Sequence, residues 1–274
     1  MSGALGSGGP GSGGLGSAPL LRVEGLTKRF GGLVANSAIS LDVPEGSLTA
    51  VIGPNGAGKT TFFNMVSGAV APTEGRVRFA GEDITGLPPA DVARRGLVRT
   101  FQLVQLFRNM TVLENVQVGL HLVTRGTLGA ALLRPRWART QERAVADRAR
   151  ELLAFVGLAK EADRPADRLA YGQQRLLEMA RALAAKPRLL LLDEPAAGLN
   201  TQESAALADI ICRVNAGGTT VLLIEHDMSL VMRVARHVAV LDFGRKIAEG
   251  TPAEVQAHPD VLAAYLGGVE FAHA

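Results

Sequence analysis

The sequence predicts an α/β fold in which a parallel sheet forms the core, antiparallel strands lie on its amino-terminal side and a helical insert interrupts it. Short apolar runs recur along the chain, as is typical of strands buried on both faces. Segments with helical periodicity separate these runs and dominate from about residue 103 to 185. Hydrophobic residues make up 47% of the 274 residues and charged residues 20%, so we expect an extensive core.

The chain begins with a segment that has no pattern of a folded element. Residues 1–19 contain eight of the 32 glycines and four serines, without a hydrophobic period. This composition predicts a flexible tail, and the segment lacks the charged start and apolar stretch of a secretory signal. We therefore expect one folded domain at residues 20–267 and a short carboxyl-terminal tail at residues 268–274.

The first strands are expected soon after this tail. Residues 39–43 alternate between apolar and polar, and Pro44-Glu45-Gly46 then supplies a turn, which predicts a half-buried strand. The apolar run Leu48–Ile52 predicts a buried strand that leads into glycines. Residues 76–79 predict a further strand.

Helical and strand patterns then alternate toward the carboxyl end. Four apolar residues share one helix face before the natural helix stop Gly157: Val145, Ala149, Leu152 and Val156. Buried strands are expected at residues 189–192, 221–224 and 238–241. Thr251-Pro252-Ala253-Glu254 predicts the capped start of a helix, because it combines an N-cap threonine, a proline at the first helical position and a capping glutamate.

Composition and charge exclude several classes of protein. The 29 basic and 26 acidic residues leave a net charge of +3, which is too small by itself to indicate nucleic-acid binding. No apolar run approaches the ~18–20 residues of a membrane span, so the chain is not expected to be a channel or a carrier itself. The single cysteine, Cys212, excludes a disulfide framework and a cysteine metal site, and its apolar neighbours predict a buried thiol in a helix.

A glycine-rich segment directly follows the strand predicted at Leu48–Ile52. Gly53-Pro54-Asn55-Gly56-Ala57-Gly58-Lys59-Thr60 matches the pattern GxxxxGK[ST], and residues typical of a helix follow from Thr61 onward. Glycines let consecutive backbone N–H groups face phosphate oxygens, and a helix amino terminus adds partial positive charge. Lys59 is expected to reach the outer phosphates, and the Thr60 hydroxyl to bind Mg²⁺. The segment predicts nucleotide binding; the alternative is an accidental glycine turn.

Two consecutive carboxylates end the apolar run at residues 189–192. Because side chains alternate on a strand, Asp193 and Glu194 are expected to point to different places. Asp193 suits the coordination shell of Mg²⁺, and Glu194 suits a base that orients or deprotonates water. A kinase would instead direct such a carboxylate at a substrate hydroxyl. The alternative without function is a strand end with solvated acids.

A histidine follows the next buried strand. His226 can donate a hydrogen bond to a γ-phosphate and so report its loss. A histidine at a strand end is more often structural when it is considered alone. The phosphate loop and the acid pair in the same chain favour the functional interpretation.

The segment that precedes the strand ending in Asp193 and Glu194 resembles a motif of a known family. Leu169-Ala170-Tyr171-Gly172-Gln173-Gln174-Arg175, here called the signature segment, resembles the signature motif of ATP-binding cassette (ABC) ATPases. Phe101-Gln102 is similar to the family's Q-loop, and Ala197-Gly198-Leu199-Asn200 is similar to its D-loop. The resemblance covers about residues 20–267. It implies an ABC-type P-loop ATPase core with an antiparallel β subdomain and an α-helical insert subdomain.

The resemblance implies a role for each matching position. Phe30 stacks on adenine, residues 53–61 hold the phosphates, and Gln102 binds Mg²⁺ or the lytic water and couples to a membrane subunit. Glu194 is implied as the catalytic base and His226 as the γ-phosphate switch. Four signature residues are implied to act on nucleotide held by a second cassette: Ala170, Tyr171, Gly172 and Gln173.

A narrower resemblance is to the ATP-binding subunit of branched-chain amino acid importers. It rests on segments that include Arg29-Phe30-Gly31-Gly32, Val98-Arg99-Thr100-Phe101-Gln102 and Ile224-Glu225-His226-Asp227-Met228. It implies ATP and Mg²⁺ as cofactors and a second ATPase subunit, identical or paralogous. It further implies two polytopic membrane subunits, an indirect partnership with a substrate-binding protein and no nucleic-acid partner. The implied location is peripheral, at the cytoplasmic face of the inner membrane.

One signature position departs from the family pattern. The family commonly has serine where this chain has Ala170, so a hydroxyl that would contact the γ-phosphate is missing. Backbone N–H groups and the helix dipole remain available to bind the anion. We hypothesise that this signature supports a weaker composite site than one that contains serine.

Three functions compete for this pattern. The first is the ATP-driven motor of a membrane importer, with transporters of urea, amides or lipopolysaccharide as close relatives. The second is a soluble ABC ATPase that acts on nucleic acid or ribosomes. Such proteins usually carry two cassettes or a long coiled-coil insert, whereas Leu169 follows Gln102 by only 67 positions here. The third is a small-molecule kinase, which would not need the signature segment. Residues 103–122 are expected either to dock a membrane subunit or to belong to the core of the helical insert.

Overall fold

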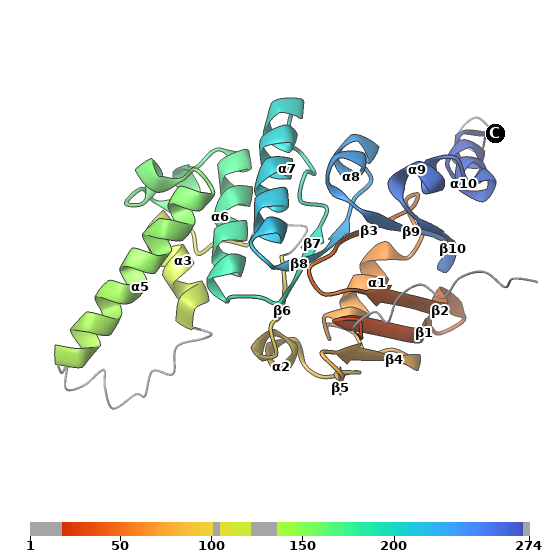
Figure 1. The fold of residues 1–274 in the computed structure, drawn as a ribbon, viewed down its shortest axis with the longest axis horizontal. Coiled ribbons are helices and arrows are strands. Elements are labelled where there is room, and N and C mark those ends of the chain that lie inside the picture. The colour runs from red at the N-terminus through yellow and green to blue at the C-terminus, as the bar shows by residue number, and fades with distance from the viewer. Residues whose placement is uncertain (1–17, 101–104, 122–135, 271–274) are drawn as a thin grey trace, which may run out of the picture.

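Two sheets with one helix between them form the centre of the molecule, and further helices cover the outer face of the larger sheet (Figure 1). The structure, a computed structural model, describes residues 18–100, 105–121 and 136–270; for residues 121, 136–141 and 266–270 it describes the backbone alone. The predicted helix after the phosphate loop is the central one, α1 (Lys59–Val66).

An antiparallel sheet forms the amino-terminal subdomain. Its four strands follow the order β2-β1-β4-β5. The strands are β1 (Leu21–Phe30), β2 (Leu33–Val43), β4 (Glu74–Phe79) and β5 (Glu82–Asp83). β1 and β2 form a hairpin whose last pair joins Phe30 to Leu33. The predicted alternation of residues 39–43 is confirmed, because the apolar side chains at 39, 41 and 43 are buried against α1 while Ser40 and Asp42 are exposed.

The larger sheet has six strands in the order β10-β9-β3-β8-β7-β6, and all neighbours are parallel except β10 and β9. The strands are β3 (Leu48–Ile52), β6 (Leu97–Arg99), β7 (Leu189–Asp193), β8 (Thr220–Ile224), β9 (His237–Asp242) and β10 (Arg245–Gly250). Every residue of β3, β7 and β8 is buried, because both faces of the sheet are covered. The carboxyl ends of these strands meet at one edge, so the segments that follow them lie together.

The two faces of the larger sheet pack into different cores. Leu191 of β7 lies in one core with Phe62 of α1, whereas Leu192 lies in the other core with Leu177 and Leu207 of the outer helices. Asp193 therefore continues the face that α1 covers. In β8, Leu222 and Ile224 also face α1, so Glu225, the residue after this strand, is placed on the face covered by the outer helices.

A helical segment lies between β6 and β7. Its described part contains α3 (Val112–His121), α5 (Arg136–Phe155), α6 (Tyr171–Ala184) and the 3₁₀ turns η1 (Ala159–Glu161) and η2 (Ala166–Arg168). The short α2 (Pro89–Arg94) precedes β6. α3 packs against both α5 and α6. Gly119 of α3 lies so close to α6 that a Cβ at this position would meet the Arg181 carbonyl oxygen at 2.3 Å. The predicted helix around residues 145–156 is α5, and Gly157 follows it with a φ of 83°.

The last helices follow the parallel strands. α7 (Thr201–Ala216) and α8 (Met228–Val234) come after β7 and β8, and α9 (Pro252–Gln256) and α10 (Pro259–Glu270) close the chain. The backbone of α10 runs past residue 267, where the sequence suggested the end of the domain. Within the three described ranges, no helix combines the length and the apolar character that a membrane crossing requires.

Most local predictions are confirmed, and one is wrong. Strand β3 has the predicted bounds, and the Thr251 side chain accepts a hydrogen bond from the Glu254 N–H at the start of α9. Cys212, in contrast, is exposed on α7. Leu207, Ile211 and Val214 define the buried face of that helix, and Cys212 lies on the other face. An apolar neighbour in the sequence therefore did not indicate burial.

Candidate functional site

The phosphate loop, residues 53–60, connects β3 to α1. Gly58 is the N-cap of α1 with a φ of 91°, and a Cβ at this position would meet the Ala35 carbonyl oxygen at 2.5 Å. A Cβ at Gly53 would meet the Leu241 carbonyl oxygen at 2.1 Å. Only glycine therefore lets the loop pass between β2 and β9 and close around the amino terminus of α1, which is the anion-binding end of the helix.

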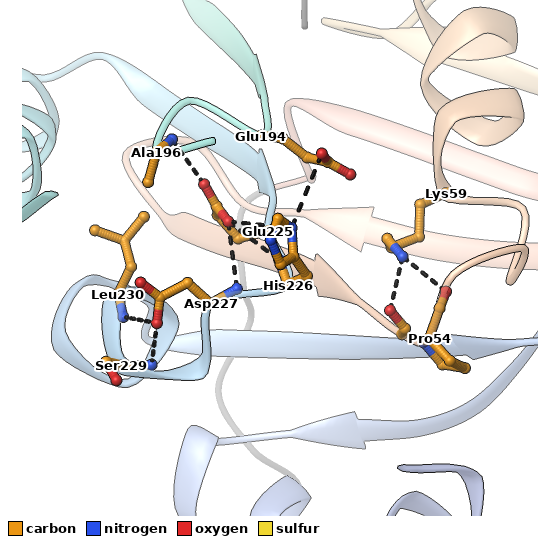
Figure 2. A network of polar contacts seen from close by, with 10 residues as sticks. Pro54, Lys59, Glu194, Ala196, Glu225, His226, Asp227, Ser229 and Leu230 are labelled. Atoms are coloured by element: carbon orange, nitrogen blue, oxygen red, sulfur yellow. Dashed lines mark hydrogen bonds and ion pairs between the residues drawn. The ribbon is translucent and has the colours of Figure 1, made fainter. Parts of the chain in front are cut away.

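Lys59 occupies the first position of α1 and is 6% exposed. Its Nζ donates to the carbonyl oxygens of Gly53 at 2.6 Å and of Pro54 at 2.8 Å (Figure 2). Burial lowers the pKa of Lys59, and the carboxylates of Glu194 and Asp193 act in the opposite direction. The ammonium group is therefore held at the loop by weak neutral acceptors, and a triphosphate would offer it a stronger counter-charge.

A cavity of about 460 Å³ opens over the phosphate loop. Its lining combines the loop with one predicted catalytic residue and with apolar residues near the β1–β2 hairpin. The lining residues are Leu33, Val34, Ala35, Asn55, Gly56, Ala57, Gly58, Lys59, Thr60, Thr61, Glu194 and Phe243. The fold thus brings Lys59, Thr60 and Glu194 to one cavity, although Glu194 is far from the loop in the sequence.

The carboxylate of Asp193 forms an ion pair with Arg99. It is 1% exposed, and its Oδ2 accepts a hydrogen bond from Arg99 Nη2 at 2.6 Å. Nη1 of the same guanidinium donates to Asn64 Oδ1 at 2.7 Å and to Ser67 Oγ at 3.0 Å. The guanidinium also lies over the Phe63 ring. Arg99 therefore ties the end of β7 to α1 and keeps a buried carboxylate paired.

The second oxygen of Asp193 tests whether the site fits a cation. Asp193 Oδ1 is buried and has no hydrogen-bond partner within the described part of the chain. A buried carboxylate oxygen without a partner is costly, and a bound cation would satisfy it. Thr60, an exposed residue of the cavity lining, supplies a hydroxyl oxygen. A carboxylate and a hydroxyl are the oxygen ligands that Mg²⁺ accepts, so the residues fit this ion.

Glu194 leaves the strand register immediately after Asp193. Its φ is 44°, an uncommon value for a residue other than glycine, and its N–H donates to the Ile224 carbonyl oxygen at 3.0 Å. Its Oε2 lies 3.9 Å from Nδ1 of His226, whose side chain is 55% exposed (Figure 2). The change of backbone conformation explains why the two neighbouring acids have different surroundings: one is buried against Arg99, and the other faces the cavity.

Glu225 completes this group of polar residues, although sequence reasoning gave it no role. It is 0% exposed and comes directly after β8. Its Oε1 accepts from the Ala196 N–H at 2.9 Å, and its Oε2 accepts from the N–H groups of His226 and Asp227 at 3.1 and 3.3 Å (Figure 2). Burial raises the pKa of Glu225, while these N–H donors act to lower it.

The signature segment starts α6. Ala170 is the N-cap, and its N–H donates to Oε1 of Gln173 at 3.2 Å, but its methyl side chain has no oxygen to return the bond. Tyr171 is 44% exposed and contacts Arg175, whose guanidinium carbon lies 5.4 Å from the ring centroid. Among the described residues that line the phosphate-loop cavity, none belongs to the signature segment. Within one chain, the signature segment therefore does not line the cavity over the phosphate loop.

Phe30 belongs to an exposed apolar edge beside the cavity. Its side chain is 49% exposed, and Lys28 Nζ lies 5.0 Å from its ring centroid. Phe30 pairs with Leu33, which lines the cavity and is 67% exposed. Phe243, 88% exposed with a φ of 42°, lies at another part of the same lining. Sequence reasoning found Phe30 but missed Leu33 and Phe243.

One predicted site residue lies outside the described part of the chain, and two charged residues beside the site were not predicted. Gln102, predicted as a ligand of Mg²⁺ or water, lies outside the described residues. Arg99 and Glu225 were missed, although each had a signal. Each charged residue stands at the carboxyl end of a buried strand, next to a strand that carries a predicted catalytic residue. Their partners became visible only when the strand order was known.

Two family models match the chain. The model described as ABC transporter matches residues 37–197. The model described as branched-chain amino acid ATP-binding cassette transporter matches residues 245–270. The first covers the phosphate loop and the acid pair, and the second covers β10, α9 and α10.

Individual relatives match almost the whole chain. The high-affinity branched-chain amino acid transport ATP-binding protein BraF of Pseudomonas aeruginosa is 48% identical over 252 residues, which cover 92% of this chain and 99% of BraF. The ADP conformation of MJ1267, an ATP-binding cassette of an ABC transporter, superposes with a TM-score of 0.80 at 35% identity and covers 92% of this chain and 100% of its own. A dimeric post-hydrolysis state of the cassette MJ0796, bound to ADP and Pi, has a TM-score of 0.72 at 25% identity, covering 85% of this chain and 98% of its own.

Proposed function

The chain belongs to the ATP-binding cassette family of transporter ATPases, and we propose that it is the ATP-hydrolysing motor subunit of an importer of branched-chain amino acids. The observation that carries the proposed substrate is the match of residues 245–270 to a branched-chain amino acid transporter model, together with the likeness to BraF over nearly the whole chain. The carboxyl-terminal match matters most, because the cassette core is common to transporters of many substrates.

The phosphate-loop cavity is the proposed ATP site. Phe30 and the adjoining apolar edge would hold the adenine, and the loop with the amino terminus of α1 would hold the phosphates. Lys59 would exchange its contacts with the Gly53 and Pro54 carbonyl oxygens for phosphate oxygens. Thr60, Asp193 and Gln102 would hold Mg²⁺, which supplies charge neutralisation at the phosphates when it is bound.

Glu194 is the proposed general base. It faces the cavity that contains Lys59 and lies 3.9 Å from the imidazole of His226. A carboxylate in this position orients the attacking water and accepts its proton, and the exposed imidazole of His226 donates to the γ-phosphate. The loss of that hydrogen bond after hydrolysis would release the residues that follow β8.

A second cassette is the proposed source of the other half of the site. The phosphate loop covers one side of a triphosphate, and the described lining of the cavity contains no signature residue. The exposed start of α6 is another anion-binding helix end, and a second chain can present it to this cavity. The dimer of MJ0796 supports such an arrangement for a related cassette.

Two polytopic membrane subunits are the proposed partners of the helical segment. A groove of about 460 Å³ lies between α3, α6 and the end of β6, and it is lined by Leu106, Phe107, Gly119, Arg181 and other residues. Phe107 and Met110 are 46% and 38% exposed, whereas Val112 is fully buried. The described part of this segment, residues 105–120, is therefore compatible with both alternatives, since Val112 belongs to the core while Phe107 and Met110 are accessible to a helix of a partner.

The location and the remaining partner follow from this assignment. A motor that docks on membrane subunits and consumes ATP would lie peripherally at the cytoplasmic face of the inner membrane. The cargo would reach the transporter through a substrate-binding protein that this chain does not touch. A nucleic-acid-directed ATPase has no support from the relatives reported above, and a basic face does not follow from a net charge of +3.

Uptake measurements test the proposed substrate. Cells that lack this chain should lose most high-affinity uptake of labelled leucine, isoleucine and valine, and the wild-type chain should restore it. Lys59→Ala should not restore uptake at equal abundance, because the ammonium group of the phosphate loop is removed. Urea and short-amide uptake should be unchanged. Loss of urea or amide uptake with normal leucine uptake would contradict the proposal and favour a related transporter.

A further inference from the structure

Glu225 is a fully buried carboxylate at the centre of the candidate site, yet the proposed hydrolysis does not use it. It lies between two loops. The Glu194 loop, residues 194–200, runs from β7 to α7; the His226 loop, residues 225–227, runs from β8 to α8. β7 and β8 are parallel neighbours and pair to their last residues, Asp193 with Ile224. The two loops therefore leave the sheet side by side.

The two oxygens of Glu225 are divided between these loops. Oε1 accepts from the Ala196 N–H at 2.9 Å, inside the Glu194 loop. Oε2 accepts from the His226 and Asp227 N–H groups at 3.1 and 3.3 Å, inside the His226 loop (Figure 2). All three partners are backbone donors. Only a group that accepts at both ends, such as an ionised carboxylate, satisfies them together.

The environment makes this contact hard to replace. Glu225 is 0% exposed, so water does not substitute for a lost bond. Burial raises the pKa of its carboxyl group, and the three N–H donors oppose this effect by favouring the ionised form. Among the described residues, Nδ1 of His226 lies 3.9 Å from Oε2 of Glu225 and 3.9 Å from Oε2 of Glu194.

We propose that Glu225 is a positioning residue that links the Glu194 loop to the His226 loop and thereby sets the separation between the catalytic carboxylate and the imidazole. This inference rests on the proposed roles of Glu194 and His226. Removing the link leaves the phosphate loop intact but lets the two side chains move independently.

The link also reaches the surface on which the signature segment lies. The Glu194 loop is exposed at Gly198, and a Cβ at Gly198 would lie 3.0 Å from Cε1 of Tyr171. The Glu194 loop, whose Ala196 N–H donates to Glu225, therefore also passes close to Tyr171.

The test compares Glu225→Gln with a matched control in the full-length protein. Glutamine has the same shape but carries one acceptor and one donor, so its amide N–H₂ must face an N–H of one of the two loops. Asp227→Asn is the control, because it is also an acid-to-amide change in the His226 loop, and Asp227 caps only α8, through the N–H groups of Ser229 and Leu230. Both variants should bind ATP as the wild type does.

The kinetics of ATP hydrolysis distinguish a positioning role of Glu225 from a general loss of structure. Glu225→Gln should lower kcat for Mg-ATP hydrolysis about tenfold or more, the effect of one buried donor–donor conflict, with KM changed less than ~3-fold. Asp227→Asn should stay within ~3-fold of the wild type. In His226→Ala, the added Glu225→Gln change should have almost no further effect, because the link acts through His226. Additive losses in the double variant would overturn the proposal.

Hydrogen exchange provides a readout that does not depend on activity. In Glu225→Gln, the amides of Ala196, His226 and Asp227 should exchange faster than in the wild type, with the core strands unchanged; in Asp227→Asn, only the first turn of α8 should respond. Unchanged exchange at both loops would refute the link, whatever the rates. Full activity of His226→Ala would instead refute the proposed role of His226, and the exchange result would still decide the link. If Glu225→Gln does not fold, Glu225→Asp, which keeps both acceptors on a shorter arm, replaces it in the same measurements.

Discussion

At the scale of single residues, two adjacent carboxylates have different surroundings, and therefore different proposed roles, because the strand ends between them. Asp193 keeps the strand register, faces α1 and is buried against Arg99. Glu194 takes a φ of 44° and faces the cavity. A residue other than glycine that adopts a positive φ of this kind costs on the order of 1–3 kcal/mol. Such strained residues cluster at functional sites. These different surroundings are the basis of the two proposed roles, Asp193 as a ligand of Mg²⁺ and Glu194 as the general base.

Arg99 is the residue whose replacement tests this division. Arg99→Lys keeps the positive charge, but an ammonium group cannot reach Asp193, Asn64 and Ser67 in the fixed geometry of a guanidinium. We expect the Mg²⁺ concentration for half-maximal ATPase activity to rise about tenfold, as is typical when the residue that orients a metal ligand is lost. Arg95→Lys, in an exposed pair with Glu82, is the control and should change nothing measurable. An unchanged Mg²⁺ requirement in Arg99→Lys would show that Asp193 is oriented by other contacts.

At the scale of elements, the sequence predicted the buried strands and the loops that follow them, because these signals are local. The run Leu48–Ile52, the glycine pattern after it and the capped start of α9 depend on residues close in the chain. The roles of Arg99 and Glu225 depend on strand order, because Asp193 ends the strand beside Arg99 and Ala196 lies in the loop that follows the strand beside Glu225. Cys212 was mispredicted because the orientation of α7, rather than the apolarity of its neighbours, decides which residues face the core.

The start of α6 carries a prediction of its own. Ala170 is an N-cap without a side-chain acceptor, although Gln173 already bonds to its N–H. Ala170→Ser would complete the capping box and add about 1 kcal/mol to the free energy of unfolding, which corresponds to a rise in Tm of roughly 1–4 °C for a chain of this size. If the missing hydroxyl also weakens the composite site, the ATPase rate of the assembled transporter should rise as well.

The control for Ala170→Ser is the same change at an exposed position away from the site. Ala257→Ser, at the C-cap of α9, should leave both Tm and the ATPase rate unchanged. A higher Tm in Ala170→Ser with an unchanged rate would mean that the hydroxyl caps the helix but does not serve the nucleotide.

At the scale of the whole molecule, the fold places the phosphate loop and Glu194 at one cavity and the signature segment elsewhere. The phosphate loop, Glu194 and His226 gather at the carboxyl ends of β3, β7 and β8. The signature segment starts α6, a helix that packs in the helical segment with α3. In the proposed arrangement, a second cassette would complete the site by presenting its own α6 to this cavity. ATP would then bind the two subunits together, and hydrolysis would release them.

The most direct test of this account is the oligomeric state of Glu194→Gln measured by light scattering with and without ATP. This variant keeps the phosphate loop but lacks the proposed base, so we expect it to lose ATP turnover and to form a stable dimer that contains two ATP molecules, with the partner cassette added if the pair is heteromeric. The dimer should be absent without ATP and absent when Lys59→Ala is added. A Glu194→Gln monomer that binds ATP and hydrolyses it at the wild-type rate, in the presence of either partner, would contradict both the base and the shared site.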